Sequence, residues 1–121
     1  MSDPLVHIEL HTANLARAAG FYSQLLGWRP ERVEAGGRSY LALDLGGGLS
    51  GGIVECGAEP ANWLPYVAVP SVAATTDRAE RLGGAVLLAP REGPAGWRSV
   101  VRAPDAGEVA FWQPKSQNPP P

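Results

Sequence analysis

The stretch VHIELHTANLARAAGFYSQLLGW, residues 6–28, carries the pattern of a strand followed directly by a helix. Residues 5–11 alternate between apolar and polar side chains, which is the two-residue period of a half-buried strand. Asn14 then offers a side-chain oxygen to the free amides of a helix start, and apolar residues recur at helical spacing after it. Gly27 stands where a helix ends in the left-handed conformation. We therefore predict a strand and then an amphipathic helix over residues 14–26.

Outward from this stretch, three more strand patterns follow, and then the whole order repeats. The remaining strands of the first half are expected over 28–34, 39–45 and 49–56, with turns at Gly36-Gly37 and Gly46-Gly47-Gly48. The second half is expected to contain a strand over 63–69, a helix capped by Ser71 and ended by Gly83-Gly84, and strands over 85–89, 97–102 and 108–113. This order predicts an α+β fold of two βαβββ modules, a weak internal repeat.

The repeat suggests how the chain is organised into one domain. Each module alone would leave the concave face of a curled sheet uncovered, so the two modules are expected to pair around a cup. We predict a first module over 1–56, a linker over 57–62, a second module over 63–113 and a flexible, Pro-rich tail over 114–121.

Composition narrows the class of protein. A chain of 121 residues with 45% hydrophobic and 18% charged residues fits one globular domain. The net charge is −2 and there is no basic run, so nucleic acid and membrane surfaces are poor partners. No apolar run reaches the roughly 20 residues that span a bilayer, and the start MSDPLVHIEL lacks the pattern of a signal peptide. Cys56 is the single cysteine, which suits a reducing compartment, and we expect a cytoplasmic protein.

Three segments resemble the vicinal oxygen chelate superfamily, which includes glyoxalase I, extradiol dioxygenases, fosfomycin-resistance proteins and bleomycin-binding proteins. They are the opening stretch 6–28, WLPYVAVPSVAATTDRAERLGG at 63–84 and APDAGEVAFWQP at 103–114, and they span nearly the whole chain. The resemblance implies the glyoxalase/bleomycin-resistance fold, with two βαβββ modules forming curled sheets around a cup. It also implies a homodimer.

In metal-dependent members of that superfamily, four side chains from the first and last strands of each half bind one divalent ion. The resemblance places these positions on His7, on or beside Glu55, on Tyr66 and on Ala110. The third is usually a histidine and the fourth a glutamate. Tyr66 is a neutral phenol at neutral pH, and Ala110 has no donor atom. Two remaining ligands are too few for a catalytic site, so we expect no bound metal and no other cofactor.

Strand alternation places Glu9 and His11 on the same face as His7, as a polar stripe. Burying such a stripe is costly unless its members bond one another or a ligand. A carboxylate-oriented imidazole also suits acid–base chemistry near neutral pH, so His7 and Glu9 are the candidate catalytic residues. The plainer alternatives are that Glu9 and His11 lie in solvent, or that the stripe supports a dimer contact.

The aromatic residues divide into two groups. Trp97 and Trp112 lie on strands expected to line the cup, and an aromatic wall favours flat or apolar ligands. Trp28 and Trp63 occupy positions where the superfamily has packing aromatics. The face of Tyr40 is ambiguous after two glycines.

Three other reactive or charged residues are expected to lie outside the site. Alternation points Cys56 away from Glu55, which favours a buried thiol without a catalytic role. Arg98 and Arg102 either lie on the surface or meet an anionic ligand at the mouth of the cup, and the surface is favoured.

We therefore predict a metal-independent protein that binds a small, aromatic organic molecule such as an antibiotic or a metabolite. The predicted ligand-binding residues are His7, His11, Glu55, Tyr66, Trp97, Ala110 and Trp112. One alternative is a metal-free isomerase, cyclase or lyase that uses His7 as acid or base. Another is a divalent-metal lyase or dioxygenase with an altered ligand set drawn from His7, His11 and Glu55.

Overall fold

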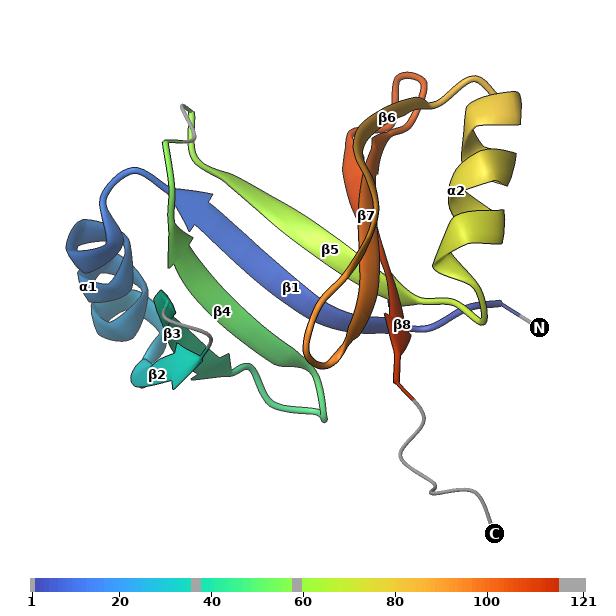
Figure 1. Cartoon of the computed structure of the whole chain (residues 1–121). Helices are drawn as coiled ribbons and strands as arrows, with labels where there is room; N and C mark the ends of the chain where they lie inside the picture. Colours follow the sequence, from blue (N-terminus) through green and yellow to red (C-terminus); the bar gives the residue numbers. More distant parts are fainter. Residues whose placement is uncertain (1, 36–37, 58–59, 116–121) are drawn as a thin grey trace, which may run out of the picture. The chain divides into compact units, whose positions relative to one another are not determined.

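The computed structural model describes residues 2–35, 38–57 and 60–115 (Figure 1). The elements in this part of the chain are β1 (Leu5–Thr12), α1 (Leu15–Leu26), β2 (Glu31–Ala35), β3 (Arg38–Asp44), β4 (Ser50–Glu55), β5 (Asn62–Ala68), α2 (Val72–Arg81), β6 (Ala85–Glu92), β7 (Gly96–Arg102) and β8 (Glu108–Pro114). The predicted α+β class and the order βαβββ, twice over, are confirmed. Among the described residues, no helix has the length and apolar character needed to cross a bilayer.

The predicted helix ends are also confirmed. Asn14 Oδ1 accepts the amide of Arg17 at 3.0 Å, and Gly27 ends α1 with a φ of 73°. Ser71 Oγ accepts the amide of Ala74 at 3.1 Å at the start of α2. These contacts satisfy amides that have no partner within the helix.

The second strand begins later than predicted. Pro30 precedes β2 and has no amide hydrogen for a ladder bond. Trp28 lies outside the strand and stacks on Tyr22, with 5.5 Å between ring centroids. The predicted turn at Gly36-Gly37 lies outside the described residues.

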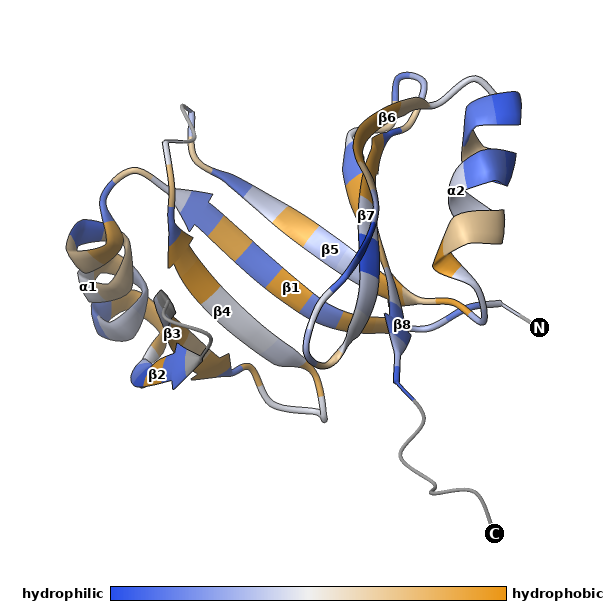
Figure 2. Ribbon diagram, in the orientation of Figure 1, coloured by the Kyte–Doolittle hydropathy of each residue, from blue (hydrophilic) through white to orange (hydrophobic). Residues whose placement is uncertain are grey.

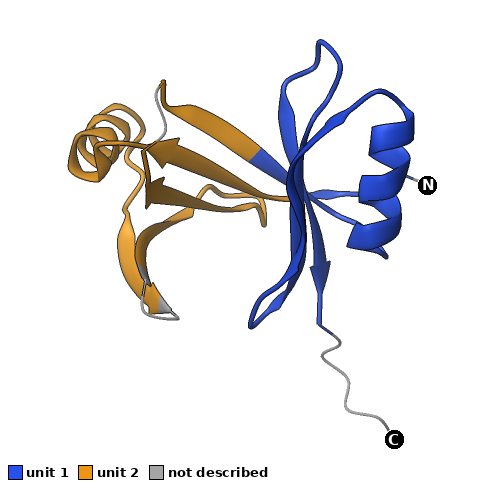
Figure 3. Ribbon diagram, turned by 45° about the horizontal axis from the view of Figure 1, so that its top comes forward, with its two compact units in different colours: residues 1–5, 65–121 blue, residues 6–64 orange. Residues whose placement is uncertain are grey.

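The chain divides into two compact units, residues 6–64 (unit 2) and residues 1–5 with 65–121 (unit 1) (Figure 3). Residues 58–59 of the predicted linker and 116–121 of the predicted tail lie outside the described residues. Pro114 is the last residue of β8.

Unit 2 contains α1 and a sheet with the strand order β2-β3-β4-β1. β2 with β3 and β3 with β4 are antiparallel, whereas β4 and β1 are parallel. Leu10, Leu43 and Ile53 form the buried core on the face that α1 covers. The partly buried residues that pack against this core are Leu15, Ala18, Ala19, Tyr22, Trp28, Leu41, Leu45 and Trp63. The prediction that the first two tryptophans are packing residues is therefore confirmed.

Unit 1 contains α2 and a sheet with the order β5-β8-β7-β6. β5 and β8 are parallel, and the other neighbours are antiparallel. Thr76 of α2 is buried, and its Oγ1 lies 2.7 Å from the Oγ of Ser99 in β7. The Val72 amide donates to Oε1 of Gln113 in β8 at 2.9 Å. These contacts show that Ser99 and Gln113 lie on the face of the sheet that α2 covers. Because side chains alternate along a strand, the residues next to them in β7 and β8 lie on the other face.

Candidate functional site

Three side chains of β1 form a hydrogen-bonded chain on the face of the unit 2 sheet opposite to α1. Nε2 of His7 lies 3.1 Å from Oε2 of Glu9, and Nε2 of His11 lies 2.8 Å from Oε1 of the same carboxylate. An ionised carboxylate only accepts, so both imidazoles donate through Nε2. Figure 2 shows the alternation along β1 that places these polar residues on one face. Their side chains are between 18% and 26% exposed, so they are held in a partly dry environment.

Ser50 extends this chain across the sheet. The parallel register sets Ser50 beside His7, and its Oγ lies 2.7 Å from Nδ1 of His7 and 3.3 Å from the carbonyl oxygen of Val6. A neutral His7 accepts the Ser50 hydroxyl at Nδ1. A protonated His7 donates to Ser50, which then donates to Val6. His7 therefore keeps its hydrogen bonds in either protonation state. The strand register creates this contact between distant residues, so sequence reasoning missed Ser50.

His11 differs from His7 in its second ring nitrogen. Its Nε2 donates to Glu9, so the lone pair of the neutral ring lies on Nδ1. Among the described residues, none forms a hydrogen bond with this Nδ1. An imidazole oriented by a carboxylate through one nitrogen, with a lone pair on the other, has the arrangement of a general base.

Gly52 lies beside the His7 ring. A Cβ added at Gly52 would lie 3.9 Å from Nε2 of His7 and 3.6 Å from Cδ2 of Tyr40. Tyr40 therefore lies on the same face as the polar stripe, which settles the ambiguity left by the sequence. The lack of a side chain at Gly52 leaves room between the phenol ring and the imidazole.

Glu55 is not brought together with His7. It pairs in register with Thr12, on the opposite face from the stripe, and its Oε2 accepts the amide of Leu15 at 3.0 Å. A carboxylate at the start of α1 is stabilised by the free amides and the helix dipole. The Glu55 side chain thus has a clear role in holding the helix end.

The prediction of a buried Cys56 is wrong. The thiol is free and exposed. β4 ends at Glu55, so strand alternation does not extend to Cys56, although its amide still donates to the carbonyl of Thr12 at 2.8 Å.

In unit 1, Tyr66 and Ala110 are neighbours in the parallel register of β5 and β8. Both are buried, with 5% and 0% of their surface exposed. Nη1 of Arg98 donates to the Tyr66 hydroxyl at 3.2 Å. The phenol that stands at an implied metal position thus orients a guanidinium.

The side chains present do not fit the four-ligand metal site that the resemblance implies. Ala110 offers no donor, Tyr66 accepts a hydrogen bond from a cation, and Glu55 binds a helix amide. Within residues 2–35, 38–57 and 60–115, no three His, Cys, Asp or Glu side chains form a group that could hold a metal ion.

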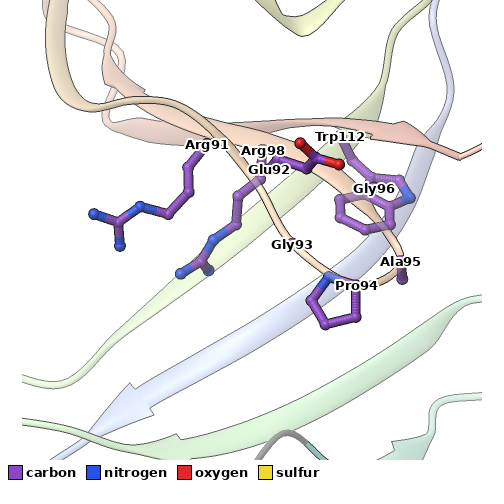
Figure 4. A pocket seen from close by; sticks show the side chains of 8 residues that line it. All are labelled: Arg91, Glu92, Gly93, Pro94, Ala95, Gly96, Arg98 and Trp112. Atoms are coloured by element: carbon purple, nitrogen blue, oxygen red, sulfur yellow. The ribbon is translucent and has the colours of Figure 1, made fainter.

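A pocket of about 290 Å³ lies where the β6–β7 hairpin meets Trp112 (Figure 4). The turn from Gly93 to Gly96 and the side chains of Arg91 and Arg98 line it. An added Cβ at Gly96 would overlap the carbonyl oxygen of Gln113 and lie 3.0 Å from Cη2 of Trp112. Gly96 therefore allows the indole ring to lie close over β7 and form a wall of the pocket. We call this cavity the Trp112 pocket.

Trp97 does not share that pocket. It pairs with Gln113, whereas Arg98 pairs with Trp112, so the two tryptophans lie on opposite faces of the sheet. Trp97 lies on the α2 face, beside a pocket of about 250 Å³ that also includes Val72. The Lys115 ammonium lies 5.8 Å from the centroid of the Trp97 ring.

The two arginines of β7 also differ from each other. Arg98 is half-buried and lines the Trp112 pocket, so the expectation of a surface position is wrong for this residue. The Arg98 side chain is on the same face of the sheet as Tyr66 and Ala110, which are buried. Arg102 is exposed, as expected, with its Nη2 3.9 Å from Oε2 of Glu108.

This order of two βαβββ modules is that of the glyoxalase/bleomycin-resistance fold, and solved structures share it. A hypothetical protein from Bacillus halodurans C-125 is 14% identical, with a TM-score of 0.70 over 99% of this chain and 100% of that one. Methylmalonyl-CoA epimerase from Mycobacterium tuberculosis is 15% identical (TM-score 0.63, 93% and 89% covered). A glyoxalase/bleomycin resistance protein/dioxygenase superfamily member from Vibrio splendidus 12B01 is 16% identical (TM-score 0.63, 93% and 99% covered).

The family follows from the sequence itself. The sequence model of the glyoxalase-like domain family matches residues 7–112, so the chain belongs to this family. No curated protein matches the chain significantly.

Proposed function

We propose that this protein binds a small aromatic molecule in the Trp112 pocket without the help of a metal ion. The observation that carries the proposal is the indole ring of Trp112, which lies over Gly96 and walls a pocket of about 290 Å³. Ligand pockets in proteins commonly measure roughly 300–1,000 Å³ and are lined mainly by apolar and aromatic groups. The volume thus suits a ligand of one or two rings.

The chemistry of the lining supports an aromatic guest. Pro94 and Ala95 contribute apolar groups to the lining, and the Trp112 indole offers a broad face for stacking. Aromatic pairs contribute about 0.5–1.5 kcal/mol beyond the apolar area that they bury. The side chains at the implied metal positions also favour capture of an organic ligand over coordination of a cation.

Calorimetric titration with one- and two-ring aromatic compounds tests this proposal. Trp112→Ala should weaken binding about tenfold or more, since the stacking surface is lost. Trp97→Ala is the matched control, because it removes the same side chain from the opposite face of the same strand pair. The proposal fails if no compound binds saturably, or if Trp97→Ala lowers affinity while Trp112→Ala leaves it unchanged.

A second candidate function rests on the chain formed by Ser50, His7, Glu9 and His11. We propose as this alternative a metal-free isomerase, cyclase or lyase in which the imidazoles move a proton. The contacts favour His11 as the base, since its Nδ1 carries a lone pair while Glu9 holds Nε2. His7 has both ring nitrogens in hydrogen bonds and would keep Glu9 in place.

Turnover separates this alternative from simple binding. In a screen of carbon-acid substrates, His11→Ala should lower kcat by about 100-fold or more with a small change in KM, because general bases contribute on that scale. His7→Ala should have a smaller effect. Full turnover by His11→Ala would remove His11 from the chemistry.

A further inference from the structure

We propose that the ligand of the Trp112 pocket is an aromatic carboxylate, held by the guanidinium groups of Arg91 and Arg98. This inference rests on the proposed binding function of the same pocket and adds the chemical class of the ligand. Figure 4 shows both arginine side chains extending in the same direction from the β6–β7 hairpin, and Trp112 lines the same pocket.

Arg91 lies directly opposite Arg98 in the antiparallel register of β6 and β7. Two like charges in this position repel each other and destabilise the pair of strands. Among the described residues, no carboxylate forms an ion pair with either guanidinium. Glu92 also lines the pocket, but its Oε2 lies 2.9 Å from the ammonium of Lys115. An anion between the two arginines would relieve the repulsion.

Two irregularities of β6 set this pair in place. One lies between Val86 and Leu88 and the other between Leu88 and Arg91, and each gives β6 one residue more than β7. One bulge moves the later side chains to the other face of a sheet, so two bulges return them to the original face. Their combined effect is to set Arg91 opposite Arg98, where an uninterrupted register would set it opposite Gly96 on the same face. The two irregularities therefore create the like-charge pair.

Tyr66 acts as a positioning residue for Arg98. Its hydroxyl is the acceptor of one Nη1 donor at 3.2 Å, and the phenol is 5% exposed. A guanidinium has five donors in a fixed planar fork, so further donors of Arg98 remain for a carboxylate. Arginine binds carboxylates in a bidentate, planar manner, which fixes the orientation of an attached ring. A ring held in this way can stack against the Trp112 wall.

The inference is tested with matched pairs of carboxylates and their neutral amides. The probes are benzoate with benzamide, 2-naphthoate with 2-naphthamide, and indole-3-acetate with indole-3-acetamide, each titrated calorimetrically into the full chain. The Kd of the tightest-binding carboxylate should be lower than the Kd of its amide by a factor of about ten or more. The reason is that hydrogen bonds between charged groups are stronger than those to a neutral amide. Arg98→Gln and Arg91→Gln should each remove most of this preference and leave amide binding nearly unchanged.

Arg102→Gln is the matched control, since it removes the same charge from the same strand outside the pocket, and it should keep the preference. Arg91 is exposed, so its variant is expected to fold even if Arg98→Gln does not. Tyr66→Phe should lower the preference a few-fold without changing amide affinity. Equal affinity for acid and amide would overturn the inference and leave the binding function standing. Failure of every probe to bind would overturn both.

Discussion

The two units share one order of elements, yet the sheet faces opposite to their helices differ in their chemistry. In unit 2, the polar residues of β1 satisfy one another, because Glu9 bridges two imidazoles and Ser50 completes the chain. In unit 1, the corresponding face carries Arg91 and Arg98 opposite each other without a carboxylate partner among the described residues. The first arrangement suits the proposed acid–base chemistry, and the second suits the proposed binding of an anionic ligand.

The largest change in stability is expected when a glycine in one sheet is replaced and compared with a glycine in the other sheet. Gly96→Ala should destabilise the protein by about 3 kcal/mol, because overpacking in a tight site costs 1–3 kcal/mol and the added methyl meets backbone. Gly52→Ala should cost well under about 1 kcal/mol, since its neighbours lie at ordinary contact distances of 3.4 Å or more. Chemical denaturation measures both.

Gly93→Ala serves as the control within the same turn, where the nearest atom to an added Cβ is 3.7 Å away. Gly96→Ala should also abolish ligand binding by moving the indole ring. Equal stability of the Gly96→Ala and Gly52→Ala variants would contradict the close approach of Gln113 and Trp112 to Gly96.

Removal of Glu9 should break the hydrogen-bonded chain on β1. Glu9→Ala leaves two imidazoles without their shared acceptor and should cost about 2 kcal/mol, as expected for lost hydrogen bonds to a charged group. The chain has two histidines, so ¹⁵N NMR of the imidazoles reports on this site alone. In the wild type both neutral rings should carry their proton on Nε2, and in Glu9→Gln at least one ring should change tautomer. Unchanged tautomers would contradict donation from both Nε2 atoms to the Glu9 carboxylate.

The helix caps should show that the two units are alike in their local structure. Asn14→Ala and Ser71→Ala each remove the acceptor of a first-turn amide and should each cost about 1 kcal/mol. Thermal unfolding with the van't Hoff enthalpy measures the loss. A cost near zero for one of them would mean that solvent replaces that cap without penalty.

The smallest effect is expected at the exposed ion pair of Asp77 and Arg81, one turn apart on α2. Both side chains are more than half exposed, so Asp77→Asn should change stability by about 0.3 kcal/mol. A loss that grows at high salt would contradict this interpretation, because screening weakens surface pairs.

Local patterns allowed the fold to be predicted, but strand register decided much of the site. Asn14, Ser71 and Gly27 mark helix ends through interactions within a few residues, so the sequence shows them directly. Alternation along β1 likewise placed Glu9 and His11 with His7. The resemblance placed Tyr66 and Ala110 at two positions of one site, and the structure sets them side by side in the parallel register of β5 and β8.

What escaped prediction depends on irregularities and on pairings between distant residues. Trp97 and Trp112 were assigned to one cavity because the relative parity of β7 and β8 is not visible in the sequence. Arg91 lies opposite Arg98 because of two irregularities in β6 that no sequence pattern indicates. Cys56 lies just beyond the last strand residue, where alternation no longer applies.

The most direct test of the account is the NMR signal of the Trp112 indole during titration with the tightest-binding aromatic carboxylate. The four tryptophans give four indole N–H resonances, which substitution assigns one by one. We expect a saturable shift of the Trp112 resonance, while the resonance of Trp97 on the opposite face stays nearly unchanged. A shift of Trp97 with a silent Trp112 would contradict it.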